Sequence, residues 1–141
     1  MVGLIVLVAA LVFSAVAALV MKWRNGRFSS AAAPGPGDTV LSAQIIGAPL
    51  GRDATLVQFS SAFCAPCRAT RVLLADIASK TDGVVTVEID AEDNLELVRD
   101  LSIMRTPTVL VLDHRGVVRT RASGLPRREQ VMAALTAARA G

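Results

Sequence analysis

The sequence predicts an α/β domain, in which helices flank a mixed central sheet, preceded by one N-terminal transmembrane helix. Three observations predict this architecture. The first 21 residues carry no charged side chain, and apolar strand-like runs alternate with helix-like repeats from residue 55 onward. The alternation ends in two neighbouring strand-like runs and a last helical segment. We therefore expect a parallel strand-helix-strand unit, extended by an antiparallel hairpin.

Residues 1–21 are predicted to be the transmembrane helix. At about 1.5 Å per residue this apolar stretch can cross a hydrocarbon core of about 30 Å. A cleaved signal peptide would have a basic residue ahead of a shorter apolar run, and nothing basic precedes Val2. Because Lys22, Arg24 and Arg27 all follow the helix, the positive-inside rule predicts a single-pass protein of the cell membrane with a cytoplasmic domain. An extracytoplasmic domain is the alternative.

Residues 22–38 form a basic juxtamembrane segment followed by a linker rich in Gly, Pro and Ala, and residues 39–141 form the folded domain. We expect residues 25–38 to be a flexible tether without packed structure. The chain has 15 Lys+Arg and 12 Asp+Glu, and three of the basic residues lie in the juxtamembrane segment, which leaves a formally neutral domain. No nucleic-acid partner is expected, since that function needs a basic face. The soluble domain is expected to be monomeric.

The elements of the domain follow in order from the apolar pattern. Residues 39–46 predict a short element of uncertain type, and residues 55–60 predict a buried strand with Leu56, Val57 and Phe59 inside. Residues 65–80 predict a helix that uses positions 69, 73 and 77 as its apolar face, which positions 72 and 74 widen. Residues 84–90 form a β-branched run and predict a second strand.

The second half of the domain is predicted in the same way. Asp93 offers an N-cap with Glu96 three residues later, as in a capping box, ahead of a short helix. Residues 108–112 and 117–121 predict a hairpin whose second strand, carrying Arg119 and Arg121, suits a sheet edge. Pro126 is expected in the first turn of a last helix that buries positions 131, 135 and 138.

Both cysteines lie in the pentad Phe63-Cys64-Ala65-Pro66-Cys67, between the first strand and its helix. A helix N-terminus favours a thiolate and can lower the pKa of a cysteine, ordinarily about 8.5, by several units. The second sulfur is near enough to close a disulfide. Structural zinc would need four ligands, and the sequence adds only His114 in a turn, so no metal and no cofactor is expected. A copper(I)-binding module is the competing hypothesis, because soft thiolates suit that ion.

Three local signatures resemble the thioredoxin-fold family, and within it the membrane-tethered, TlpA-like thiol-disulfide oxidoreductases of bacteria. They are Val57-Gln58-Phe59 leading into the cysteine pentad, Val87-Glu88-Ile89-Asp90, and Arg105-Thr106-Pro107-Thr108. The resemblance covers roughly residues 56–138 by element order, and it implies the thioredoxin-like fold.

The resemblance also implies roles for individual residues. Cys64 is expected to be the attacking thiolate and Cys67 the resolving thiol of a redox-active disulfide, with Pro66 as a supporting residue between them. Pro107 resembles the cis-proline of the family, which leaves the backbone of Thr106 free to pair with an extended substrate peptide. Gly124 corresponds to a glycine that lines the substrate groove.

Two departures from the family pattern affect these expectations. The family usually has Trp before the first cysteine and Gly after it, where this chain has Phe63 and Ala65. Gln58 takes the position of a buried aspartate that assists proton transfer from the resolving thiol. An amide does not titrate and cannot act as a base, and Glu88 is the nearest acidic candidate in sequence.

We therefore predict a membrane-anchored thiol-disulfide oxidoreductase that exchanges its Cys64-Cys67 pair with protein disulfides and takes electrons from an upstream donor. The alternatives are an outward-facing TlpA-like relay in cytochrome maturation and the non-catalytic copper-binding module.

Overall fold

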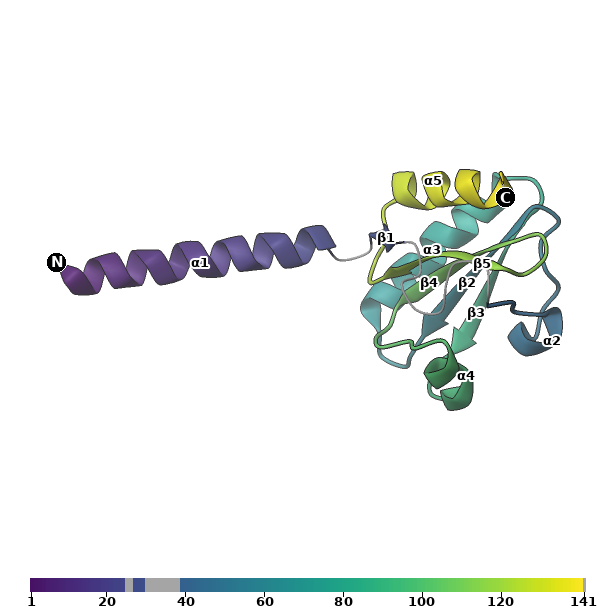
Figure 1. Cartoon of the computed structure of the whole chain (residues 1–141), viewed down its shortest axis with the longest axis horizontal. Coiled ribbons are helices and arrows are strands. Elements are labelled where there is room, and N and C mark those ends of the chain that lie inside the picture. The colour runs from purple at the N-terminus through teal and green to yellow at the C-terminus, as the bar shows by residue number, and fades with distance from the viewer. Residues whose placement is uncertain (25–26, 30–38, 141) are drawn as a thin grey trace.

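The computed structural model describes residues 1–24, 27–29 and 39–140. The chain forms a long N-terminal helix followed by an α/β domain (Figure 1). The elements in chain order are α1 (Val2–Arg24), β1 (Phe28–Ser29), α2 (Ala43–Ile46), β2 (Ala54–Ser60), α3 (Ala65–Ser79), β3 (Val84–Asp90), α4 (Leu95–Asp100), β4 (Thr108–Asp113), β5 (Val118–Ser123) and α5 (Arg128–Arg139).

The sheet has the strand order β1-β5-β4-β2-β3. Strands β2 and β3 are parallel and are joined through α3, whereas β4 runs antiparallel to both β2 and β5. The predicted strand-helix-strand unit and hairpin are therefore confirmed, and the fold is the thioredoxin-like arrangement of a mixed sheet between helices.

Helices cover both faces of the sheet (Figure 1). On one face α3 and α5 bury a cluster that includes Leu56, Leu74 and Leu135. On the other face the segments around α2 and α4 pack against a cluster that includes Phe59 and Leu110. Strand β2 is buried along its whole length because it lies between both clusters, which explains its nearly continuous apolar sequence.

The buried side of α3 agrees with the predicted one at Leu74 and Ile77 and differs from it elsewhere. Its buried residues are Cys67, Thr70, Leu74 and Ile77, whereas position 69 is exposed and position 73 is only half-buried. The helix starts immediately after Cys64, which is its N-cap, and this start turns Cys67 toward the sheet. Successive steps of three, four and three residues then keep the same side of the helix inward.

Two predicted helix starts are wrong. Helix α4 follows Asn94 without a side-chain cap, so Asp93 is not the N-cap; Asn94 Nδ2 instead donates a hydrogen bond to the carbonyl oxygen of Asp90, 2.8 Å away. Helix α5 has Arg127 as its N-cap, so Pro126 lies just before the helix and not in its first turn. The predicted inward face of α5, at positions 131, 135 and 138, is confirmed.

Helix α1 extends away from the domain as a single rod (Figure 1). Its segment Val2–Trp23 has a mean hydropathy of 3.0 over its most apolar window, none of which is buried, so it is long and apolar enough to cross a membrane. The helix continues to Arg24, three residues beyond the predicted boundary.

Part of the predicted linker is structured. Phe28 and Ser29 form β1, which pairs antiparallel with Ala122 and Arg121 of β5, and Phe28 is half-buried against the cluster between the sheet, α3 and α5. The expectation of a tether without packed structure is therefore wrong at these two residues, and β5 is not an edge strand. Residues 25–26 and 30–38 of the predicted linker lie outside the described part of the chain.

Candidate active site

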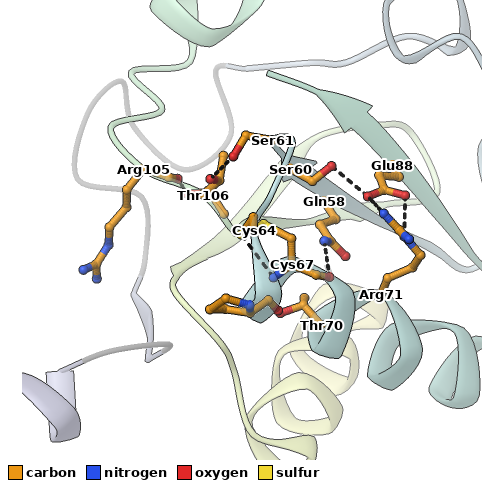
Figure 2. Close-up of a disulfide and its surroundings, with 12 residues drawn as sticks. Gln58, Ser60, Ser61, Cys64, Cys67, Thr70, Arg71, Glu88, Arg105 and Thr106 are labelled. Atoms are coloured by element: carbon orange, nitrogen blue, oxygen red, sulfur yellow. Dashed lines mark hydrogen bonds and ion pairs between the residues drawn. A yellow bond between two sulfur atoms is a disulfide. The ribbon is translucent and has the colours of Figure 1, made fainter. Parts of the chain in front are cut away.

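The two cysteines lie at the start of α3 and form a disulfide, with their Cα atoms 5.2 Å apart. Cys64 is the N-cap residue and has an extended backbone, and Cys67 lies in the first turn. The backbone N–H of Cys67 points at Sγ of Cys64, at an N to S distance of 3.2 Å (Figure 2). When the pair is reduced, this N–H and the positive end of the helix stabilise a thiolate on Cys64.

The two cysteines differ in their access to solvent. Cys64 is partly exposed, whereas Cys67 is 1% exposed because it faces the sheet from the buried side of α3. A second molecule can therefore reach the sulfur of Cys64, and the sulfur of Cys67 can react with Cys64 inside the chain.

The residues flanking Cys64 shape the loop that presents it. Phe63 has a positive φ of 59°, which is unusual for an aromatic residue, and its side chain is fully exposed. Pro66 lies in the first turn of α3, where its missing N–H breaks no helical hydrogen bond. Its carbonyl oxygen accepts a hydrogen bond from Thr70 Oγ1 at 2.9 Å. The loop is therefore fixed by the helix behind it.

Gln58 lies on β2 beside the cysteine pair (Figure 2). The side chain is 1% exposed, and its Nε2 donates a hydrogen bond to the carbonyl oxygen of Cys67 at 2.8 Å. A buried amide can make this bond at any pH because it carries no charge. Gln58 thus supports the backbone of Cys67 and supplies no proton acceptor.

Glu88 is held by partners other than the cysteines. It lies opposite Gln58 on β3, but its carboxylate is turned toward Arg71 of α3 (Figure 2), with Arg71 Nε and Nη2 each 2.6 Å from one of its oxygens. Ser60 Oγ donates a third hydrogen bond at 2.7 Å. The hydrogen bonds from Arg71, with a smaller contribution from Ser60, lower the pKa of Glu88 against the opposing effect of burial. The hydrogen bonds to Glu88 raise the pKa of Arg71.

The ion pair decides what Glu88 can do near the cysteines. Arg71 joins α3 to β3 through Glu88. Glu88 is ionised at neutral pH and already engaged, so it is not suited to accept the proton of Cys67.

The third signature brings a second loop to the disulfide. The peptide bond between Thr106 and Pro107 is cis, which is the isomer that the resemblance implies. Oγ of Ser61 and Oγ1 of Thr106 are 2.8 Å apart and hydrogen-bonded, which ties this loop to the end of β2 (Figure 2). The N–H of Gly124 donates to the carbonyl oxygen of Pro107 at 2.7 Å, so the loop after β5 joins the same site.

Sequence reasoning did not identify Ser60 and Ser61 as part of the site. The sequence did contain a feature that could have indicated them: two hydroxyl side chains directly follow an apolar strand and precede Cys64 by four and three residues. The partner of each serine lies far along the chain, at Glu88 and Thr106, and this pairing is visible only in the fold.

Other candidate residues lie apart from the cysteines or on the surface. His114 occupies the turn after β4, at the opposite end of that strand from Pro107. Met104 is 89% exposed, so it does not belong to the core. Arg68 is exposed on α3. Within residues 1–24, 27–29 and 39–140 no group of three His, Cys, Asp or Glu side chains is placed to hold a metal ion.

The chain has a mixed sheet and a Cys-x-x-Cys disulfide at the N-terminus of its crossover helix. This combination is typical of one class of proteins, the thiol-disulfide oxidoreductases with a thioredoxin-like fold. Comparison with known proteins identifies the family. The family model described as Thioredoxin matches residues 45–137, and the chain belongs to this family. The matched residues include the Cys64-Cys67 pair, which is closed as a disulfide.

Individual relatives share the core of the domain. Thioredoxin domain-containing protein 2 of Mus musculus is 38% identical over 58 residues, which is 41% of this chain and 11% of that protein. Putative thioredoxin H10 of Arabidopsis thaliana is 32% identical over 57 residues, or 40% of this chain and 37% of that protein. The chain thus spans only a small part of the mouse relative and about a third of the plant one.

Solved structures agree on the fold. A chloroplastic thioredoxin z superimposes with a TM-score of 0.56 at 26% identity, covering 64% of this chain and 81% of that one. Thioredoxin f from spinach chloroplast gives a TM-score of 0.55 at 24% identity, covering 63% and 79%.

Proposed function

We propose that the chain is a membrane-anchored oxidoreductase that exchanges its Cys64-Cys67 pair with disulfides of protein substrates. The observation that carries this proposal is the disulfide at the start of α3, with Cys64 partly exposed and Cys67 buried. That asymmetry suits an attacking sulfur and a resolving sulfur, respectively.

The exchange proceeds in two steps. The thiolate of Cys64 attacks one sulfur of the substrate disulfide, forms a mixed disulfide and releases the other substrate sulfur as a thiolate. Cys67 then loses its proton and attacks Sγ of Cys64, which expels the second substrate thiolate. The chain is left as the Cys64-Cys67 disulfide, and two electrons have passed to the substrate. An upstream dithiol donor returns the pair to its reduced form.

The surroundings of the pair support the remaining roles in this proposal. Gln58 holds the carbonyl of Cys67 and does not titrate, so the proton of Cys67 passes to water. The backbone of Thr106, beside cis-Pro107, receives an extended segment of the substrate. The exposed side chains of Phe63 and Met104 offer it an apolar rim.

Insulin reduction with dithiothreitol as donor tests the enzymatic proposal on the full chain in detergent. Cys64→Ser should abolish the catalysed precipitation of insulin chains, while His114→Ala, a change at the far end of β4, should keep it. If Cys64→Ser reduces insulin as fast as the wild type, the proposal is wrong.

We also propose that α1 anchors the chain with the domain on the cytoplasmic side, because Lys22, Arg24 and Arg27 all follow the uncharged residues 1–21 and no basic residue precedes them. Alkaline phosphatase fused after residue 141 should then be inactive, and the same fusion made to green fluorescent protein should fluoresce. Strong phosphatase activity would place the domain outside and favour the outward-facing arrangement.

A further inference from the structure

A pocket lies where the end of α1 meets the domain. It has a volume of about 700 Å³ and is lined by Leu19, Lys22, Trp23, Arg27, Leu125 and Arg127. We call it the interface pocket. Residues from opposite ends of the chain meet there because β1 pairs with β5, which holds the segment just after α1 against the domain beside the loop that follows β5.

The interface pocket is positively charged on one part of its lining. Lys22, Arg27 and Arg127 supply three cations, and no acidic residue lines it. Within the described residues none of the three forms an ion pair, whereas six arginines elsewhere in the domain do. Several like charges around one cavity attract an anion, and Arg in particular matches the oxygens of a phosphate group.

The rest of the lining is apolar. Leu19 and Trp23 come from the last turns of α1, and Leu125 from the loop before α5; all three are substantially exposed. A ligand that uses both parts of the pocket must combine an anionic group with hydrocarbon. A free phosphate ion would leave the apolar part uncovered.

We propose that the interface pocket binds the headgroup of an anionic phospholipid. The proposal rests on the membrane anchoring proposed above, which puts Trp23 and Lys22 at the boundary between hydrocarbon and water. The lipid phosphate lies among Lys22, Arg27 and Arg127, and the first part of its acyl chains follows Leu19 and Trp23 into the bilayer.

Lipid bound at this site would fix the orientation of the domain relative to the membrane surface. Arg127 is the N-cap of α5 and so belongs to the folded domain, not to the anchor. The loop that carries it begins at Gly124, whose N–H is bonded to the carbonyl of Pro107 beside the disulfide. Lipid bound at Arg127 therefore holds the loop that borders the active site, and it sets the direction in which the disulfide faces.

Trp23 is the only tryptophan of the chain and reports directly on the pocket. The full chain is placed in nanodiscs of phosphatidylcholine with increasing fractions of phosphatidylglycerol, and the emission of Trp23 is followed. The wild type should give a saturating change. Arg127→Gln should raise the half-saturating fraction about fivefold, as expected for the loss of one cation near an anionic membrane, and Arg127→Lys should restore most of the response.

The controls separate this proposal from its alternatives. Arg99→Gln, on α4 at the other face of the sheet, removes one arginine charge and should leave the titration unchanged. The Gln at position 127 keeps the backbone N–H that bonds Gln130 Oε1, so α5 keeps that cap. Lys22→Gln provides a second variant from the anchor side and should shift the curve in the same direction.

Three results would overturn the proposal. They are an Arg127→Gln titration that matches the wild type, no response to phosphatidylglycerol, and an equal response to inorganic phosphate in phosphatidylcholine nanodiscs. Alkaline extraction of the membranes distinguishes the underlying failures. A chain that leaves the bilayer contradicts the anchoring as well, whereas a chain that stays but ignores phosphatidylglycerol contradicts the lipid site alone.

Discussion

Replacing Gln58 by Glu tests whether the side chain beneath Cys67 is buried as described. The change keeps the size of the residue and places a carboxyl group 2.8 Å from the carbonyl oxygen of Cys67, at a position that is 1% exposed. A protonated carboxyl can still donate the hydrogen bond of Gln58. A carboxylate there would be desolvated and would face a carbonyl oxygen, so its pKa is raised above the ordinary value of about 4.3.

The magnitude follows from the burial. Fully buried carboxyl groups have their pKa raised by about 3 units or more, and each unit corresponds to about 1.4 kcal/mol. Because the pKa in the folded state is the higher one, the stability of Gln58→Glu is close to that of the wild type below about pH 4. It then decreases as the pH rises between the two pKa values and is about 4 kcal/mol lower at about pH 8.

Urea unfolding of the oxidised domain from Arg27 onward, measured from acid to mildly alkaline pH, provides the assay. Gln58→Leu is the matched control, since it removes one neutral hydrogen bond and should cost about 1 kcal/mol at every pH. If the difference between Gln58→Glu and the wild type does not change with pH, the side chain is solvated and the described packing against Cys67 is wrong.

Three further predictions concern the parts that hold the site in place. Burial alone raises the pKa of Asp113, but backbone N–H groups, first that of Val117, and Arg119 bond its carboxylate and lower it overall. Asp113→Asn should therefore reduce the free energy of unfolding by about 2–3 kcal/mol at neutral pH. The difference in free energy of unfolding between the variant and the wild type should disappear as the pH falls below about 4, and a difference that does not change with pH would contradict this. A double-mutant cycle with Arg71→Gln and Glu88→Gln should give a small favourable coupling, because the pair is partly exposed, and zero coupling would mean that it does not join α3 to β3. Phe28→Ala should destabilise the domain by about 1–2 kcal/mol, less than a fully buried Phe, and no change would show that β1 is not docked.

The alternation of apolar runs was sufficient to predict the central part of the fold. Strands β2 and β4 are buried along their whole length and therefore appear as nearly continuous apolar runs, whereas helix α3 buries one side and leaves an apolar repeat. The short strand β1 has only two residues, and nothing in a Gly- and Pro-rich segment indicates that Phe28 finds a partner on β5. Its pairing depends on an edge that exists only after the hairpin has formed.

The candidate site could be predicted to a similar extent. The cysteine pair and its place at a helix start follow from local sequence, and the resemblance singles out Pro107. The contacts between Ser60 and Glu88, and between Ser61 and Thr106, join residues 28 and 45 positions apart, respectively. The parallel register of β2 and β3 and the approach of two loops create them, and no local pattern encodes either contact.

The central claim is that Cys64 attacks the substrate and Cys67 resolves the intermediate. The most direct test is to mix reduced Cys67→Ser with a protein that contains an accessible disulfide and to look for a covalent complex on a non-reducing gel. We predict that Cys67→Ser accumulates this mixed disulfide, which dithiothreitol releases, and that Cys64→Ser forms none because its remaining sulfur is buried. Accumulation of the complex by Cys64→Ser, or by neither variant, would contradict the proposed mechanism.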